Sequence, residues 1–338
     1  MDLKNLGRSR GQAGAGRGPW PKVIGVAIAV VLVIMGITAW YWSREPEPFW
    51  VNWEAEGRPA VPGYATTHTL IRAAGTLLDK PGGYLSNDIT PPSVFLDNMP
   101  NWEFGVLVQV RDLARVLRND FSRSQTQSIA DPDLEQAEPN FNFDSHSWIL
   151  PASESKYREA IEHLEAYLAR LDAQVDSRAQ FYARADNLRE WLAVVEKRLG
   201  NLSQRLSASV GQVRVNTDLA GDPSAQSNQP AADKVVVKTP WLEIDDVFYE
   251  ARGTAWALVH FLRAIEYDFR QVLVDKNAEV SLRQVIRELE AGLAPMRSPI
   301  VLNGKGYGIF ANHSLVMASY LSRANQAITN LRELLDQG

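Results

Sequence analysis

The stretch "LREWLAVVEKRLGNLSQRL", residues 188–206, carries the apolar pattern from which the fold class follows. Its large apolar residues follow one another at alternating steps of four and three positions, and they are Leu188, Leu192, Val195, Leu199, Leu202 and Leu206. An α-helix turns once in about 3.6 residues, so this spacing places the six side chains in one seam along one helical face. The stretch therefore predicts a long helix that packs its apolar seam against other helices.

Four more segments have a helical apolar pattern. Two of them keep the same steps of four and three, namely Tyr157, Ile161, Leu164, Leu168, Leu171, Val175 and then Met317, Leu321, Ala324, Ile328, Leu331, Leu335. A further segment has small residues at one end, where a neighbouring helix could approach closely: Val247, Ala251, Ala255, Leu258, Leu262, Ile265, Phe269, Val272. The last has a broader stripe, which is Val106, Val110, Leu113, Leu117, Phe121.

No segment alternates convincingly with a period of two between turn residues, and the run "VVV" at 235–237 is too short and isolated to found a sheet. No fixed-period internal repeat is present. The sequence therefore predicts an all-α fold, a bundle of long antiparallel helices rather than a solenoid.

The N-terminal region contains "VIGVAIAVVLVIMGITAWYW", Val23 to Trp42, which is 20 residues without a charge. At about 1.5 Å of rise per residue, such a helix spans a hydrocarbon core of about 30 Å. The run ends in Trp40, Tyr41 and Trp42, and amphipathic aromatic residues favour the membrane–water interface. We therefore predict a single transmembrane helix that contacts the membrane from Val23 to Trp42.

The basic residues before this run predict its orientation. They are Lys4, Arg8, Arg10, Arg17 and Lys22, and only Asp2 opposes them. The positive-inside rule then keeps the tail in the cytoplasm and predicts that everything after Trp42 is exported. A cleaved signal peptide is the alternative, but the apolar run is longer than the usual h-region of about 7–15 residues.

Composition and periodicity divide the whole chain into six segments. We predict a cytoplasmic tail (1–22), the transmembrane helix (23–42), a proline-rich linker (43–65), a first helical half of the exported domain (66–210), a flexible or irregular insert (211–239) and a second helical half (240–338). The polar stretch 122–152 is expected to interrupt the helices of the first half. The sequence leaves open whether the two halves share one core.

Composition also excludes some classes of function. The chain of 338 residues has no cysteine, which rules out disulfides, thiolate catalysis and cysteine-ligated metals. Residues 1–42 hold five of the 35 basic residues and one of the 40 acidic residues, so the remainder is acidic. An acidic domain repels phosphate backbones, so we expect no nucleic-acid partner.

The first candidate site is acidic. In "TPWLEIDDVFYEARG", residues 239–253, Asp245, Asp246 and Glu250 lie close together, and paired carboxylates can act in general acid–base catalysis. The structural alternative is an ordinary helix start, with Thr239 as the cap, Pro240 in the first turn and acids near the positive end of the helix dipole.

The second candidate site is a glycine-rich loop within "VLNGKGYGIFANHS", residues 301–314. It offers Asn303, Gly304, Lys305, Gly306, Tyr307 and Gly308, with His313 just beyond, as candidate ligand-binding or catalytic residues. The spacing matches neither phosphate-binding glycine pattern. We therefore interpret the loop as a crossover between helices, with Asn312 capping the next helix, and leave anion or glycan binding open.

The five histidines do not have the spacing of metal ligands, so we predict neither a metal site nor a cofactor. One of them, His260, lies near an apolar seam, and we interpret it as a core histidine.

Six strings together resemble a bacterial family catalogued as domain of unknown function 2333. They are "GYLSNDI" (83–89), "PNWEFGVL" (100–107), "FYARADNL" (181–188), "RLGNLSQRLSAS" (198–209), "KTPWLEIDDVFYEARG" (238–253) and "ANHSLVMASYLSRAN" (311–325). The resemblance implies an inner-membrane protein of Gram-negative bacteria with a periplasmic domain. It implies no catalytic or binding residue.

Three functions remain open at this point. The leading hypothesis is a non-catalytic scaffold or accessory subunit that binds other cell-envelope proteins, or associates with itself, through its helices. The alternative is a periplasmic enzyme or binding protein that acts on cell-wall glycans through the acidic cluster or the glycine-rich loop. A small-ligand sensor is less favoured, because only a short tail precedes the membrane span.

Overall fold

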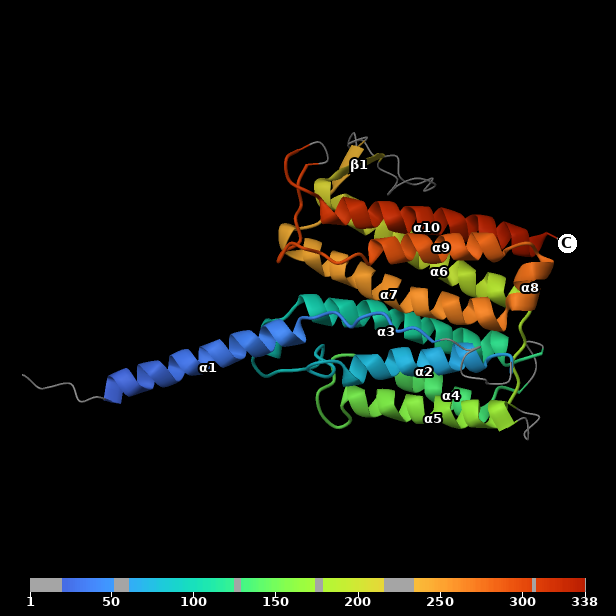
Figure 1. Cartoon of the computed structure of the whole chain (residues 1–338), viewed down its shortest axis with the longest axis horizontal. Helices are drawn as coiled ribbons and strands as arrows, with labels where there is room; N and C mark the ends of the chain where they lie inside the picture. The colour runs from blue at the N-terminus through green and yellow to red at the C-terminus, as the bar shows by residue number, and fades with distance from the viewer. Residues whose placement is uncertain are drawn as a thin grey trace, which may run out of the picture.

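The computed structural model describes residues 20–51, 61–124, 129–173, 179–215, 234–305 and 308–337. It confirms the predicted all-α fold: an N-terminal helix, α1 (Trp20–Trp42), leaves one end of a bundle of long helices (Figure 1). The other α-helices are α2 (Tyr64–Asp79), α3 (Asn98–Val116), α4 (Pro132–Phe141), α5 (Ser153–Ala173), α6 (Ala185–Ser207), α7 (Ile244–Asp268), α8 (Arg270–Asp275), α9 (Glu279–Gly292) and α10 (His313–Asp336).

The bundle is built in layers around the central pair α3 and α7 (Figure 1). On one side α7 packs on α9, while α10 packs on both α6 and α9. On the other side α2 contacts α3 and α7, and α5 packs on α2 and α4. Buried apolar residues from Val61 to Leu335 form one contiguous cluster, so helices from 66–210 and 240–338 share a single core.

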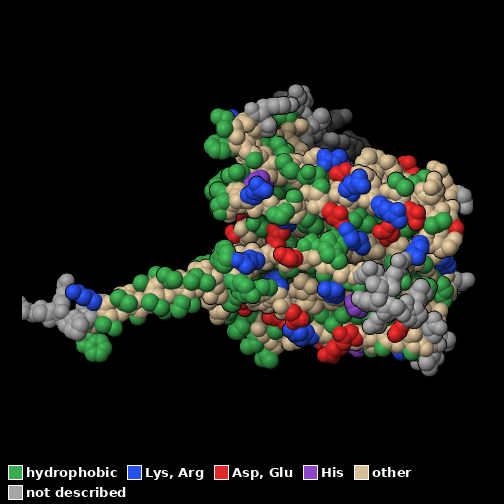
Figure 2. All heavy atoms as spheres, viewed as in Figure 1, with side chains coloured by type: hydrophobic (Ala, Val, Ile, Leu, Met, Phe, Trp, Pro, Cys, Tyr) green, Lys and Arg blue, Asp and Glu red, His purple; other side chains and the backbone are tan. Residues whose placement is uncertain are grey.

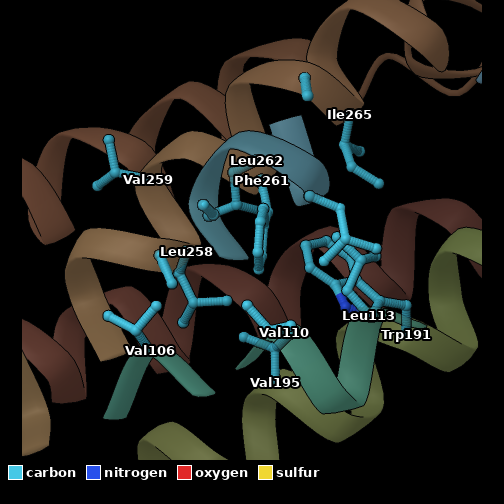
Figure 3. Close-up of a cluster of buried hydrophobic side chains, with 14 of the residues drawn as sticks. Val106, Val110, Leu113, Trp191, Val195, Leu258, Val259, Phe261, Leu262 and Ile265 are labelled. Carbon is cyan, nitrogen blue, oxygen red and sulfur yellow. The ribbon is translucent and has the colours of Figure 1, made fainter. Parts of the chain in front are cut away.

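The apolar seams lie where the periodicity predicts. All six seam residues of α6, from Leu188 to Leu206, are buried, and so are all six of α10, from Met317 to Leu335. In α5 the predicted seam is buried at every second position and half-buried between, while Val175 lies outside the described residues. The close-up in Figure 3 shows apolar side chains of α3, α6 and α7, among them Val110, Val195 and Leu258, clustered in the core.

Two glycines set the distance between α3 and α7. A Cβ atom on Gly105 of α3 would lie 2.1 Å from the carbonyl oxygen of Glu250, and one on Gly253 of α7 would lie 2.0 Å from that of Trp102. Real Cβ atoms do not come so close to backbone oxygens, so only glycine fits at either position. A neighbouring helix thus approaches closely at the small-residue end of this segment, as predicted, but the contact is made by Gly253, which lies between the predicted Ala251 and Ala255.

The structure corrects the reading of 122–152 as a polar interruption, because α4 lies within it. Asp131 caps this helix by accepting a hydrogen bond from the Asp133 amide at 3.0 Å, and Pro132 occupies the first turn. Leu134, Ala137 and Phe141 are buried on one face. Only three of the ten residues of α4 are both apolar and buried, so its helical period cannot be recognised among the acidic and amide side chains.

Two further expectations about secondary structure were wrong. The seam from Val247 to Val272 is not one helix, since α7 ends at Asp268 and the short helix α8 follows. In addition, "VVV" belongs to strand β2 (Lys234–Val237), which pairs in antiparallel register with β1 (Gln212–Val215). These strands lie at the two ends of the predicted insert, and a partner that far away leaves no local signal.

The end of α1 and the segment after it are attached to the bundle at three successive points. Trp42 packs against Gly82, where an added Cβ would lie 2.8 Å from the indole ring. Glu45 forms an ion pair with Arg252 of α7, with Oε1 and Nε 2.6 Å apart. Phe49 then packs on the core. The end of α1 is thus held against one end of the bundle.

Candidate functional site

The acidic residues at the start of α7 do not point in one direction. Asp246 faces α3, where its Oδ1 accepts a hydrogen bond from Asn101 Nδ2 at 2.7 Å. Burial raises the pKa of Asp246 to about 6, and the charges of Asp245, Asp97 and Glu243 add to the shift. The cluster therefore contains a carboxyl group that titrates above the ordinary range of aspartate.

Glu250, one turn further along α7, faces α6 and forms an ion pair with Arg205 at 2.8 Å. It lines a cleft of about 570 Å³ between α3, α6 and α7. Asp246 is not among the residues that line this cleft. The two carboxylates share a helical face in the sequence, but their nearest partners belong to different helices.

The cleft between α3, α6 and α7 is rich in cations. Four basic residues line it, and they are Arg115, Lys197, Arg198 and Arg205. Asp112 of α3 holds two of them, because its carboxylate lies 2.8 Å from Arg198 Nε and 3.3 Å from Arg115 Nη2. Lys197 has no ion-pair partner among the described residues. The cations therefore outnumber the acids in and behind the cleft.

The cleft also has an apolar part and an unsatisfied polar group. Phe104, Val108 and Val194 line it, and the Phe104 ring is exposed although it lies beside the buried core. Gln109 is almost fully buried, and its Nε2 has no hydrogen-bond partner in the described part of the chain. An exposed aromatic ring and flanking arginines are features of surfaces that bind protein segments.

His313 lies on another side of α7. Its Nδ1 accepts a hydrogen bond from the Leu302 amide at 3.1 Å, and its ring lies 6.1 Å from the ring of Phe248. Burial lowers its pKa, and the nearby Arg252 charge acts in the same direction. His313 is therefore engaged in closing the loop onto α10 and does not face Asp246 or Glu250.

The loop before α10 is held together by its own amides. Asn312 caps α10 as predicted, with Oδ1 accepting from the Leu315 amide at 2.8 Å, and its Nδ2 donates to Asn303 Oδ1 at 2.7 Å. Asn303 in turn donates from Nδ2 to the Ser209 carbonyl at 3.1 Å. These bonds connect the loop to the end of α6.

The glycines of this loop fit the predicted crossover. A Cβ on Gly304 would lie 2.0 Å from the Phe310 carbonyl oxygen, so the two backbones touch there. The Gly304 amide donates to the Ala311 carbonyl at 3.0 Å, and the Gly308 amide donates to the Lys305 carbonyl at 2.6 Å. Gly306 and Tyr307 lie outside the described residues. The amides of Gly304 and Gly308 thus bond within the loop instead of facing a ligand.

The hydrogen-bond and ion-pair partners of the candidate residues are consequently in three places: Asp246 binds to α3, Glu250 lies in the cleft, and His313 and Asn303 lie at the crossover. The charges of Asp245 and Glu250 nevertheless act on Asp246 and raise its pKa. Within the described ranges, no group of three or more histidine, aspartate or glutamate side chains is arranged to hold a metal ion.

Sequence reasoning missed a buried ion pair near the end of α2. Lys80 Nζ lies 2.6 Å from Glu103 Oε1, and both side chains are almost completely buried. Glu103 also accepts from the amides of Leu85 at 2.8 Å and Ser86 at 2.9 Å. Leu85 and Ser86 lie in the string "GYLSNDI" and Glu103 lies in "PNWEFGVL", but nothing in the sequence indicated that the glutamate side chain points toward the first string or toward Lys80.

The fold and these sites define a helical-bundle protein with one N-terminal helix that is long and apolar enough to cross a membrane. A family model described as an uncharacterized protein conserved in bacteria, DUF2333, matches residues 16–338, and the chain belongs to this family. The resemblance that the six strings indicated is thereby confirmed. No curated protein and no solved structure matches the chain.

Proposed function

We propose that this is a single-pass inner-membrane protein whose periplasmic helical domain binds an acidic segment of another cell-envelope protein. The observation that carries the proposed binding is the cleft between α3, α6 and α7, with its surplus of cations around the exposed ring of Phe104. Interfaces are enriched in arginine and aromatic residues, and complementary charge speeds and orients association.

The proposed location is supported by α1 and the tail before it. The apolar side chains of α1 lie away from the bundle up to its last residue, Trp42, and none of the membrane-length window is buried. A free helix of this composition in water would expose a large apolar surface, which a bilayer would cover. The basic residues before α1 favour a cytoplasmic N-terminus.

The binding role is supported further by the dispersion of the candidate catalytic groups. A general acid or base has to lie within hydrogen-bond reach of a shared substrate, directly or through one water. Asp246, Glu250 and His313 instead contact α3, α6 and the crossover loop respectively. The polar groups of the cleft, in contrast, converge on one hollow.

In-cell photo-crosslinking tests the binding role. A photo-reactive residue is placed at position 104 in the cleft and, as a control, at position 287, which is an exposed arginine on α9 away from the cleft. We expect a specific envelope protein to be captured from position 104 only. Lys197→Glu should weaken this capture and Arg287→Glu should not, because only Lys197 faces the cleft. Equal capture at both positions, or capture of no envelope protein, would overturn the proposal.

Reporter fusions test the location independently. A reporter that is active only in the periplasm is fused after residue 60, and a cytoplasmic reporter is fused there in a second strain. We expect activity from the periplasmic reporter alone. Activity of the cytoplasmic reporter would reverse the proposed orientation.

A second candidate function is action on cell-wall glycans, and the observation that favours it is the raised pKa of Asp246 within a cluster of carboxylates. Purified protein is incubated with isolated cell wall, and released fragments are separated by chromatography. Release that disappears in Asp246→Asn would support this candidate. The scaffold proposal predicts that no fragments are released.

A further inference from the structure

The loops at the end of the bundle where α1 emerges carry large exposed apolar side chains. Four loops meet there: 80–97, 142–152, 238–243 and 293–312 (Figure 1). Each one presents such residues, and they are Ile89, Val94, Phe95, Trp148, Ile149, Leu150, Trp241, Leu242, Ile300, Ile309 and Phe310. Figure 2 shows hydrophobic side chains gathered at this edge of the molecule. We call these residues the end-face cluster.

The side chains of the end-face cluster are largely exposed to solvent. Leu150 is 90% exposed, Ile309 98%, Trp241 77% and Phe95 73%, so each loop contributes at least one residue that the bundle hardly covers. Toward the opposite end the large exposed apolar side chains among the described residues are fewer, and they include Ile129, Val274, Val280 and Trp50, whose ring lies beside His260 and Arg263 of α7. Single exposed aliphatic residues are common on proteins, but a set gathered on one end marks an interaction surface.

The backbone conformation of Leu150 indicates that its exposed position is functional. This residue has a φ of 45°, in the left-handed region that leucine rarely adopts. Strained conformations of bulky residues persist where the surroundings require them, and they concentrate at functional sites. In the loop before α5, the exposed Leu150 therefore has a strained backbone conformation.

From these observations we propose that the end-face cluster lies in the interfacial layer of the same bilayer that α1 crosses. This inference rests on the proposed membrane anchoring. The connection is short: Trp42 packs on Gly82, and only three residues later Glu45 is paired with Arg252. Three extended residues span at most about 10 Å, which is little more than the thickness of one headgroup layer, roughly 5–8 Å. The end face therefore cannot stand far from the membrane.

The chemistry of the cluster fits the lipid interface. Trp148 and Trp241 are residues that favour the boundary between headgroups and acyl chains. The acidic residues at this end, among them Asp97 and Asp144, are offset by Lys238, Arg297 and Lys305 on the same loops, so net charge gives this face no strong preference for anionic lipid. The contact we propose is apolar, and it holds the long axis of the bundle upright on the membrane.

Site-directed fluorescence in nanodiscs tests the inference, and the absence of native cysteine makes single labels simple to place. The full chain is labelled at Leu150→Cys or Phe310→Cys in the cluster, at Ile129→Cys or Val280→Cys at the opposite end, and at Val30→Cys within α1. The nanodiscs contain phosphatidylcholine with a lipid-bound quencher near the headgroups or deep in the acyl chains. The side chains at all four bundle positions are exposed, and circular dichroism checks the fold of each variant.

We expect the shallow quencher to act several-fold more strongly at 150 and 310 than at 129 and 280. High salt, or added phosphatidylglycerol, should not increase this quenching, because the contact is apolar. Quenching at 30 by the deep quencher, together with equal and weak quenching at 150, 310, 129 and 280, would overturn the end-face proposal while leaving the anchor intact. Loss of quenching at 30 would instead overturn the anchor, and the end-face proposal with it. Protection of 150 and 310 only after a partner protein is added would assign the face to protein.

Discussion

The backbone amide of Phe49 donates a hydrogen bond to His260 Nε2 at 3.0 Å, and the two rings stack with their centroids 3.9 Å apart. The other ring nitrogen, Nδ1, lies 2.6 Å from the Trp256 carbonyl oxygen. Both contacts are satisfied only by a neutral imidazole with its proton on Nδ1. A core histidine of α7 thus attaches the segment that follows α1 to the bundle, which confirms the interpretation of His260 and gives it a specific role.

The neutral state of His260 predicts a loss of stability in acid. Burial lowers the pKa of His260 to about 4, and the charges of Arg263 and Arg72 act in the same direction. The unfolded chain therefore binds a proton from about pH 6.5 downward, whereas the folded protein resists it until about pH 4. The free energy of unfolding should fall by about 3 kcal/mol as the pH drops through this window. Denaturant unfolding at a series of pH values measures the fall.

His260→Phe keeps a ring at this position and removes the titration. It should be less stable at pH 7 by about 1–3 kcal/mol, because the Phe49 amide loses its acceptor, but it should lose less on acidification. His163→Asn on α5 is the control and should keep the wild-type fall, since it leaves His260 in place. An equal fall in His260→Phe would show that other groups cause the acid sensitivity.

We predict opposite changes in stability for two glycine substitutions, one at the close crossing of α3 and α7 and one on α2, where there is room for a methyl group. Gly253→Ala places a methyl group 2.0 Å from the Trp102 carbonyl oxygen, so α7 has to move, and we expect a loss of at least about 3 kcal/mol or no folded protein. Gly75→Ala in α2 meets its nearest neighbour, a carboxylate oxygen of Asp79, at 3.9 Å. It should stabilise the protein by about 0.5–1 kcal/mol through helix propensity. Thermal unfolding of both variants compares them, and similar melting temperatures would contradict the close packing.

The buried pair of Lys80 and Glu103 predicts a large effect of a small chemical change. Glu103→Gln keeps the shape but leaves the Lys80 ammonium buried without its counter-charge, which should cost about 3–5 kcal/mol. Asp79→Asn breaks the pair with Arg158, whose side chains are 65% and 56% exposed, and should cost less than about 1 kcal/mol. Chemical denaturation measures both. Partial recovery of stability in the double variant with Lys80→Met would identify the unpaired ammonium as the cause.

The raised pKa of Asp246 predicts a window in which rising pH lowers stability. Burial raises this pKa to about 6, so the folded state holds a proton that the unfolded chain releases near pH 4. The stability that Asp246 contributes is present below about pH 4 and is lost as the pH rises to about 6. Asp246→Asn keeps an acceptor for Asn101 and should be more stable than wild type at pH 7, with little difference at pH 4.

Asp245→Asn provides the matched comparison for this prediction. It removes the neighbouring charge that acts second after burial, so the pKa of Asp246 should fall and the window should move to lower pH. Melting temperatures between pH 4 and pH 7 measure both variants. A pH profile of Asp246→Asn identical to that of the wild type would show that this carboxyl is not perturbed.

Local patterns in the sequence were sufficient for much of the architecture. The seam of α6 and that of α10 repeat every three and four residues, and this period can be read wherever apolar residues are dense. The same holds for α1, where 20 uncharged residues leave little ambiguity. Where apolar residues are sparse, as in α4, or where a strand needs a distant partner, as in β1 and β2, the local pattern failed.

The candidate sites were less accessible from the sequence than the helices. A spacing of four placed Asp246 and Glu250 on one helical face, but a face can contact two neighbouring helices, and here it contacts α3 and α6. The cations of the cleft, such as Arg115 and Arg205, come from helices far apart in the chain. Nothing in their own neighbourhoods indicates that they meet.

The amino-acid sequence was therefore enough to establish the helical class, the apolar helix α1 and the seams of the bundle, because these depend on residues within a few turns of one another. The partners of individual polar side chains depended on how the helices pack. Lys80 and Glu103, or Phe49 and His260, lie in different elements, and burial makes each contact strong only once those elements are in place. The gathering of apolar loops around the end of α1 likewise follows from chain reversals at each end of the bundle, which no single segment encodes.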